Sequence, residues 1–265
     1  RFEKGGFTAS QRRVFAAVSR SEGGFDTVQT YDTGCVSVGF IQFITHKDGK
    51  HSLSAVLQRQ KSDFPDAFEA DFRRYGVDVL PDSTLVVVDP STGAELAGAD
   101  AVSKIVEDKR LVAVFQRAGR HSEAFQITQI RTAFDRYWPG QTRFDVAGKD
   151  GIRISGTVAD IVRSEAGMAT LVDRKVNTGN LGTFADVVAR VAREQGCRDL
   201  NDLRSYERLI VTGLRHRVNY LDDSKLSQPE GGDQAARSRS ARPGAFAERS
   251  SDLPSHGTAG RSRRQ

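Results

Sequence analysis

Apolar residues recur at helical spacing over most of residues 5–227, and this pattern constrains the fold more than any other feature of the sequence. The first predicted helix starts at a Thr8 or Ser10 cap, places Val14 and Phe15 on one face and ends near position 21. The same criteria predict further helices over residues 52–63, 65–75, 99–107, 109–118, 121–137, 157–176, 183–195 and 199–219.

Short extended segments interrupt this helical pattern. Residues 27–31 and 36–40 are predicted strands joined by the turn Asp32-Thr33-Gly34, and residues 85–96 form a predicted hairpin around Asp89-Pro90-Ser91-Thr92-Gly93. Residues 140–155 are predicted to be irregular or extended. The pattern therefore predicts an α+β protein that is mainly α.

The last part of the chain has a different composition. Residues 228–265 are rich in Ser, Arg, Gly and Pro and contain almost no large apolar side chains. Such a segment buries too little surface to offset the entropy lost on ordering, so we predict a disordered tail after a folded domain over residues 1–227. Seven arginines against four acidic residues give the tail a net charge of +3, more than half of the chain's formal +5. Its basic character favours polyanionic partners.

Several classes of protein and site find no support in the sequence. The two cysteines, Cys35 and Cys197, are too few for a disulfide framework, and we expect two independent thiols. No apolar stretch is long enough to span a membrane, and residues 1–20 lack the apolar core of a secretion signal. His46 and His51 have no third ligand at metal-site spacing, so we expect neither a metal nor an organic cofactor.

A pair of carboxylic acids carries the clearest chemical signal. Glu22 follows the first predicted helix and precedes Gly23-Gly24, and the negative end of a helix in a partly apolar setting raises the pKa of a carboxyl group. A raised pKa lets a general acid keep its proton near neutral pH. Asp32 lies in an exposed turn that leaves it ionised, and Ser37 follows where its hydroxyl can hold a water molecule. One protonated and one ionised carboxyl group form the catalytic pair of glycoside hydrolases.

Other polar residues allow two interpretations. Asp173 and Asn177 lie four residues apart on one predicted helix face, where they either end a helix that is capped by Gly179 or reach a cleft and contact sugar. The amide and aromatic side chains of residues 125–129 are interpreted as core packing, although sugar grooves use the same residue types.

The segment around Glu22 resembles the lysozyme-like superfamily. Glu22, Asp32 and Ser37 are similar in spacing and context to the Glu–Asp–Thr triad of phage-type lysozymes, with Ser in place of Thr and the aspartate one residue later. The resemblance covers residues 20–43. It implies a two-lobed fold with a sugar cleft and a small β-hairpin lobe.

The same segment also resembles goose-type lysozymes and lytic transglycosylases. Residues 37–43 contain a Gly-x-x-Gln signature, in which Gly39 allows a close approach of the chain and Gln42 lines the sugar groove. By this resemblance Tyr31, Gly39 and Gln42 are substrate-binding residues, and we add Asp173 and Asn177 to the same group.

The sequence thus predicts a glycoside hydrolase of β-1,4-linked amino-sugar polymers, with peptidoglycan as the leading substrate, Glu22 as general acid and Asp32 as base or electrostatic partner. A chitosanase and a lytic transglycosylase are the enzyme alternatives. The non-enzyme alternative is a wall- or nucleic-acid-binding module that uses the basic tail. We expect a monomer that acts on a polysaccharide outside the cell, in the periplasm or at the wall, without a specific nucleic-acid partner.

Overall fold

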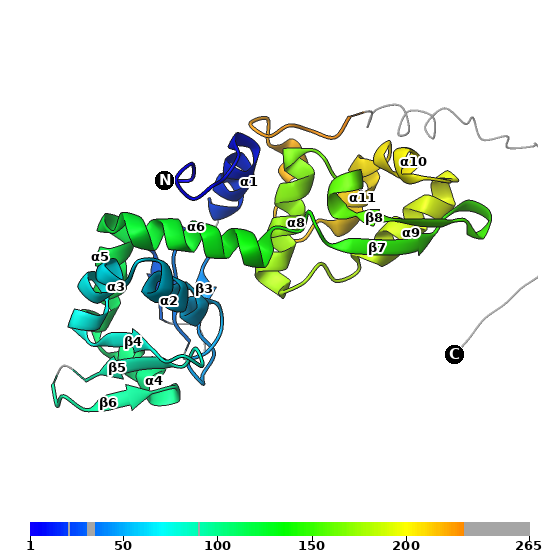
Figure 1. The fold of residues 1–265 in the computed structure, drawn as a ribbon. Coiled ribbons are helices and arrows are strands. Elements are labelled where there is room, and N and C mark those ends of the chain that lie inside the picture. Colours follow the sequence, from blue (N-terminus) through cyan, green and yellow to red (C-terminus); the bar gives the residue numbers. More distant parts are fainter. Residues whose placement is uncertain (21, 31–34, 90, 231–265) are drawn as a thin grey trace, which may run out of the picture. The chain divides into compact units, whose positions relative to one another are not determined.

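The computed structural model describes residues 1–20, 22–30, 35–89 and 91–230. The predictions at Tyr31 and Asp32, and those for the tail from residue 231 onward, lie outside the described residues. Within the described part the chain is mainly helical with small antiparallel sheets, which confirms the predicted class (Figure 1). No helix of this part is long and apolar enough to cross a membrane.

The N-terminal helix and the first sheet position Glu22. Helix α1 (Ala9–Ser19) is capped by Thr8, whose hydroxyl accepts from the Gln11 amide while the Gln11 side chain accepts from the Thr8 amide. Three short strands follow in one antiparallel sheet; they are β1 (Val28–Gln29), β2 (Ser37–Val38) and β3 (Phe43–Ile44). The third strand was not predicted, because two residues are too few to produce a periodic pattern.

A second sheet follows two helices. The elements are α2 (Ser52–Asp63), α3 (Pro65–Asp71), the 3-10 turn η1 (Arg73–Tyr75), β4 (Val77–Val79), β5 (Leu85–Val88) and β6 (Glu95–Ala97). Strands β5 and β6 form the predicted hairpin, and β4 adds a strand on the other side of β5. Gly76, with φ +80°, provides the left-handed residue that ends η1 and starts β4.

Three helices come next, at α4 (Ala99–Glu107), α5 (Lys109–His121) and α6 (Glu123–Tyr137). Helix α6 packs against α2, α3, α5 and α8, and it passes beside the first three of these in Figure 1. Buried residues lie on most of its circumference, as expected for a helix inside a core, and they include the polar Gln126, Thr128 and Gln129. The predicted start at position 121 moves to Glu123 because Ser122 caps the helix.

The C-terminal half pairs a hairpin with short helices. Its elements are β7 (Arg143–Ala147), the 3-10 turn η2 (Lys149–Gly151), β8 (Arg153–Thr157), α7 (Val158–Ile161), α8 (Glu165–Thr178), α9 (Phe184–Gln195), α10 (Leu200–Arg204), α11 (Glu207–Leu214) and η3 (Tyr220–Asp222). Gln228 donates to the backbone carbonyl of Asp223 and Pro229 is buried, so chain packing continues past position 227.

The sequence predicts two long continuous helices in this half, and this prediction is wrong because both are interrupted. The helix predicted over 157–176 breaks at Ser164, whose hydroxyl accepts from the Gly167 amide and donates to Glu207 Oε1 at 2.6 Å. The cap and a buried carboxylate together satisfy the polar groups that the break exposes. The helix predicted over 199–219 divides into α10 and α11 and ends at Leu214, after which Arg215 is extended with ψ 135°.

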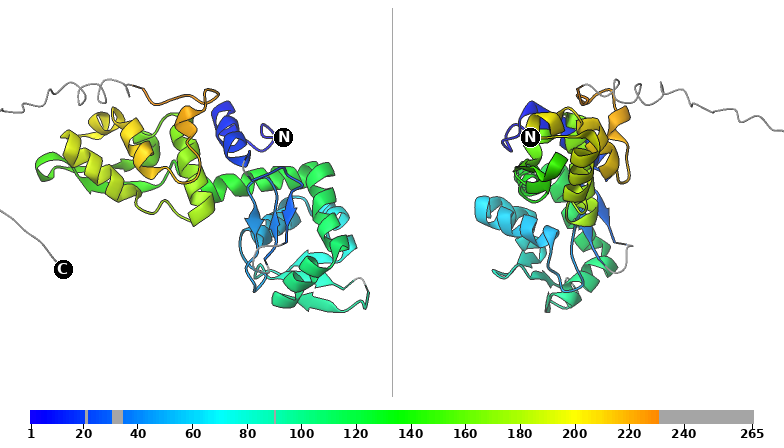
Figure 2. Two further views of the ribbon diagram at one scale, coloured as in Figure 1. Left: turned by 180° about the vertical axis from the view of Figure 1, so that it is seen from behind. Right: turned by 90° about the vertical axis from the view of Figure 1, so that its right-hand side faces the viewer.

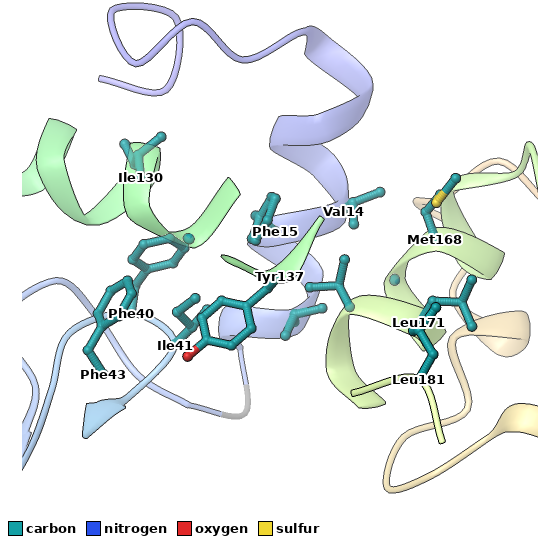
Figure 3. Close-up of a cluster of buried hydrophobic side chains, with 14 of the residues drawn as sticks. Val14, Phe15, Phe40, Ile41, Phe43, Ile130, Tyr137, Met168, Leu171 and Leu181 are labelled. Carbon is teal, nitrogen blue, oxygen red and sulfur yellow. The ribbon is translucent and has the colours of Figure 1, made fainter. Parts of the chain in front are cut away.

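The apolar core joins elements that are far apart in the sequence. Helix α1 lies against α8, as the views of Figure 2 also indicate. Figure 3 shows Phe15 of α1 near Phe40 and Tyr137, and the ring centroids of Phe15 and Phe40 are 6.4 Å apart. Because the segment after β2 supplies Phe40 and Phe43 to this core, its backbone is fixed close to Glu22. Both cysteines are free thiols, as predicted.

Candidate active site

Glu22 lies just beyond the end of α1. Its amide and that of Gly23 both donate to the Ser19 carbonyl, at 3.0 and 2.9 Å, and Gly23 then takes φ +119°. This turn directs the chain away from the helix, and only 11% of the Glu22 side chain is exposed. The predicted position at the end of an apolar helix is confirmed.

The surroundings of Glu22 raise its pKa. Burial is the largest cause, because it disfavours the charged form, and the nearby carboxylate of Asp173 adds to the effect. The guanidinium of Arg217 acts in the opposite direction through its charge and its hydrogen bond. Burial and Asp173 outweigh Arg217, so the pKa of Glu22 is raised above its ordinary value, in the direction that a general acid requires.

Arg217 connects Glu22 to helix α8. Its Nη1 atom donates to Glu22 Oε1 at 3.0 Å and also to Asn177 Oδ1 at 2.5 Å. Arg217 reaches this position because α11 ends at Leu214 and the following chain is no longer helical. Sequence reasoning missed this residue, since one arginine among many, 195 positions from Glu22, carries no local signal.

Arg217 connects Asn177 to Glu22 by hydrogen bonds, and Asn177 in turn is bonded to Asp173. Asn177 Nδ2 donates to the backbone oxygen of Asp173 at 2.8 Å and to its Oδ1 at 3.2 Å. Asp173 is only 2% exposed, and burial raises its pKa against the opposing effects of Arg217, His216 and Tyr220. Asp173 therefore belongs to the support of the site, whereas Asn177 is exposed and can contact a ligand.

Asp173 has one oxygen without a partner. The Tyr220 hydroxyl acts on its pKa from nearby, yet neither Asp173 Oδ2 nor the Tyr220 hydroxyl forms a hydrogen bond within the described part of the chain. Burial raises the pKa of Tyr220, and the adjacent carboxyl groups of Asp173 and Glu22 raise it further, so the phenol keeps its proton. A buried, protonated phenol can donate a hydrogen bond to Asp173 after a small shift.

Gln42 holds the backbone of the catalytic candidate. Its Nε2 atom donates to the Glu22 carbonyl at 3.0 Å and to the Gly39 carbonyl at 2.9 Å. The residue takes φ +51°, a left-handed conformation that is uncommon outside glycine. The structure thus brings Gln42, Gly39 and Glu22 together, with the Gln42 amide on the Glu22 backbone.

Gln129 of α6 supports the same segment from below the surface. Its Oε1 atom accepts from the Phe40 amide at 3.3 Å, and its Nε2 atom donates to the Phe25 carbonyl at 3.1 Å. A Cβ atom on Gly39 would lie 2.1 Å from that oxygen, so only glycine fits. The interpretation of residues 125–129 as core packing holds for the burial of Gln129 but missed its polar contacts with this segment.

Ser37 lies on β2 between Gln29 and Ile44, and it is buried in the sheet. Asp32 lies outside the described residues, so its role as the partner of Glu22 stays a prediction. The same applies to Tyr31.

A pocket of about 390 Å³ adjoins this network. It is lined by Ile44, His46, His51, Arg136, Tyr137, Val176, Asn177, Thr178 and Gly179. Asn177 belongs both to the pocket wall and to the hydrogen bonds that lead through Arg217 to Glu22. The size lies in the range of ligand pockets.

Gly179 caps α8 in the left-handed conformation, as predicted.

No group of three or more metal-ligating side chains occurs among the residues that the structure describes. Comparisons of the chain with protein families, with curated proteins and with solved structures found no match.

Proposed function

We propose that this protein is a glycoside hydrolase that cleaves a β-1,4-linked amino-sugar polymer, with peptidoglycan as the favoured substrate. One observation carries the proposal: Glu22, a carboxyl group with a raised pKa, is held by Arg217, whose second partner Asn177 lines a ligand-sized pocket. A carboxyl group in this state is suited to protonate a leaving oxygen. The small β-sheet lobe and the cleft of a lysozyme-like fold are part of the same proposal.

In the proposed reaction Glu22 donates its proton to the glycosidic oxygen while the bond from that oxygen to the sugar C1 breaks. Positive charge develops at C1, and a water molecule adds there and loses a proton to Asp32, helped by Ser37. A separation of roughly 6.5–9.5 Å between the two carboxyl groups would give inversion at C1. The steps need no metal or organic cofactor.

Arg217 has two roles in this scheme. Its hydrogen bond fixes the orientation of the Glu22 carboxyl group. Once Glu22 has given up its proton, the guanidinium stabilises the carboxylate that remains, because opposite charges attract strongly in a half-buried site. Asn177 Oδ1 accepts a second hydrogen bond from the same Nη1 atom and so helps to keep the guanidinium in place.

The test is the release of soluble products from purified peptidoglycan, with wild type compared with Glu22→Gln. Glu95→Gln is the matched control, because Glu95 is exposed on strand β6 and the change removes the same charge. We expect muropeptides with a reducing end, identified by mass spectrometry, from wild type and the control, and none from Glu22→Gln.

Other products would contradict parts of the proposal. Anhydro-muropeptides would show a lytic transglycosylase, and cleavage of chitosan alone would show a chitosanase. Absence of any Glu22-dependent cleavage of either polymer, together with tight wall binding, would favour the non-catalytic binding module.

A further inference from the structure

The pocket that shares Asn177 with the hydrogen bonds leading to Glu22 is lined, among the residues that the structure describes, by basic and neutral groups. Its described ionisable side chains are Arg136, His46, His51 and the Tyr137 phenol, and no acidic residue of the described ranges belongs to its wall. Arg136 is exposed at the end of α6, and none of the ion pairs formed by the described residues includes it. An arginine in a pocket without a carboxylate partner is typical of an anion site.

The two histidines are packed against each other on this side of the pocket. Their ring centroids are 4.2 Å apart with an interplanar angle of 62°. His51 Nδ1 is buried and has no hydrogen-bond partner among the described residues. Burial, His46 and Arg136 lower the pKa of His51, while Asp48 in the adjoining loop raises it. The lowered pKa favours the neutral form of the His51 imidazole, so the guanidinium of Arg136 is the group that can attract an anion here.

We propose that this pocket binds a carboxylate carried by the peptide of peptidoglycan, with Arg136 as the principal contact. The inference rests on the proposed function, since it names the part of the polymer that the pocket adjoining Glu22 would accept. Arg136 offers a planar pair of donors to the carboxylate. His46 lines the same pocket. Asn177 lines this pocket and also accepts a hydrogen bond from Arg217, which donates to Glu22.

This assignment separates substrates by charge. Chitosan is a polycation, and the guanidinium of Arg136 in this pocket would repel its ammonium groups. Chitin oligosaccharides are neutral and would gain nothing from Arg136. A peptide-bearing muropeptide carries several carboxylates, whereas the peptide-free disaccharide carries only the carboxylate of the lactyl ether.

The test measures equilibrium binding by calorimetry on full-length protein with the Glu22→Gln background, so that turnover is not needed. The ligands are the disaccharide tetrapeptide, the peptide-free disaccharide of N-acetylglucosamine and N-acetylmuramic acid, and neutral chitotetraose. Arg136→Gln is compared with Arg143→Gln, which removes the same charge from an exposed position on β7. Melting temperatures verify that both variants fold.

We expect Arg136→Gln to weaken binding of the disaccharide tetrapeptide about tenfold, as loss of a charged hydrogen bond predicts, and to change chitotetraose binding less than twofold. Arg143→Gln should leave both unchanged. An equal loss for the peptide-free disaccharide would place the lactyl carboxylate in the pocket instead and would overturn the peptide assignment. Unchanged tetrapeptide binding by a folded Arg136→Gln would overturn the inference altogether.

Failure of this inference and failure of the proposed function give different results. Glu22-dependent cleavage with unaltered binding by Arg136→Gln would refute this inference alone. Selective loss of tetrapeptide binding in a protein that cleaves no polymer would refute the hydrolase and leave the carboxylate pocket standing.

Discussion

Glu22 is subject to two opposing influences whose balance determines its chemistry. Burial and Asp173 raise its pKa, and Arg217 lowers it. A general acid works only while protonated, so the rate falls as pH rises through this pKa. In the proposed reaction the arginine therefore limits how far into the alkaline range Glu22 keeps its proton, while it orients the carboxyl group.

Replacement of Arg217 by glutamine removes the influence that lowers the pKa of Glu22. We expect the alkaline limb of the pH–rate profile to move to higher pH, and the maximal rate to fall on the order of tenfold because the carboxyl group loses its orientation. Arg215→Gln, an exposed arginine two residues earlier, is the control. An alkaline limb that stays in place or moves to lower pH would contradict the assigned role.

Asp173 gives a second prediction, on stability. Its pKa is raised in the folded state, so the folded protein holds its proton more tightly than the unfolded chain does. The stability that this proton contributes is complete below the unfolded pKa and is lost as pH rises through the folded pKa. Asp173→Asn has no such proton, so wild type should lose melting temperature relative to this variant as pH rises from about 4 through the raised pKa of Asp173. Scanning fluorimetry across this range tests it, and a relative gain by wild type would refute it.

At the scale of elements, the segment between α1 and β3 depends on helix α6. Gln129 holds the backbone of Phe25 and Phe40, and Gly39 passes so close to it that no side chain fits. The backbone of Glu22 is then fixed through Gln42. A buried amide on α6 thus helps to position a carboxyl group just beyond the end of α1.

Gly39→Ala tests this close approach against a matched control. Gly39 and Gly93 both have positive φ, +90° and +74°, but only at Gly39 would the new Cβ atom meet another residue. We expect Gly93→Ala to lower the free energy of unfolding by about 1 kcal/mol through backbone strain alone. Gly39→Ala should lower it by about 2–4 kcal/mol, because overpacking adds to the strain. Urea unfolding measures both, and equal losses would contradict the contact.

The same elements show how far the sequence predicts this fold. Helices α1, α2 and α9 follow from apolar spacing, which the Thr8 cap reinforces at α1, so their prediction succeeds. The breaks at Ser164 and after Leu214 depend on tertiary partners such as the Glu207 carboxylate, which no local pattern reveals. The sequence predicts the position of Glu22 after the first helix because its signal is local. It does not predict the contact of Arg217 with Glu22, because the fold brings together residues that are 195 positions apart.

At the scale of the whole molecule, the basic tail is separate in composition from the rest of the chain. Residues 231–265 contain seven arginines and three acidic residues. We expect a chain that ends at Glu230 to keep its melting temperature and its rate on soluble oligosaccharides, and to lose retention on anionic cell walls at low salt, since such attraction is screened by ions. Cosedimentation with walls at several salt concentrations tests this. Undiminished retention of the shortened chain at low salt would assign wall binding to the folded part.

The most direct test of the central claim is the initial rate of reducing-end release from purified peptidoglycan, measured at the optimum pH of wild type. Loss of a general acid predicts that Glu22→Gln is slower on the order of 10³-fold, with a melting temperature no lower than that of wild type, because the substitution removes a carboxyl group that burial disfavours in its charged form. A folded Glu22→Gln protein that retains a rate within tenfold of wild type would contradict the claim.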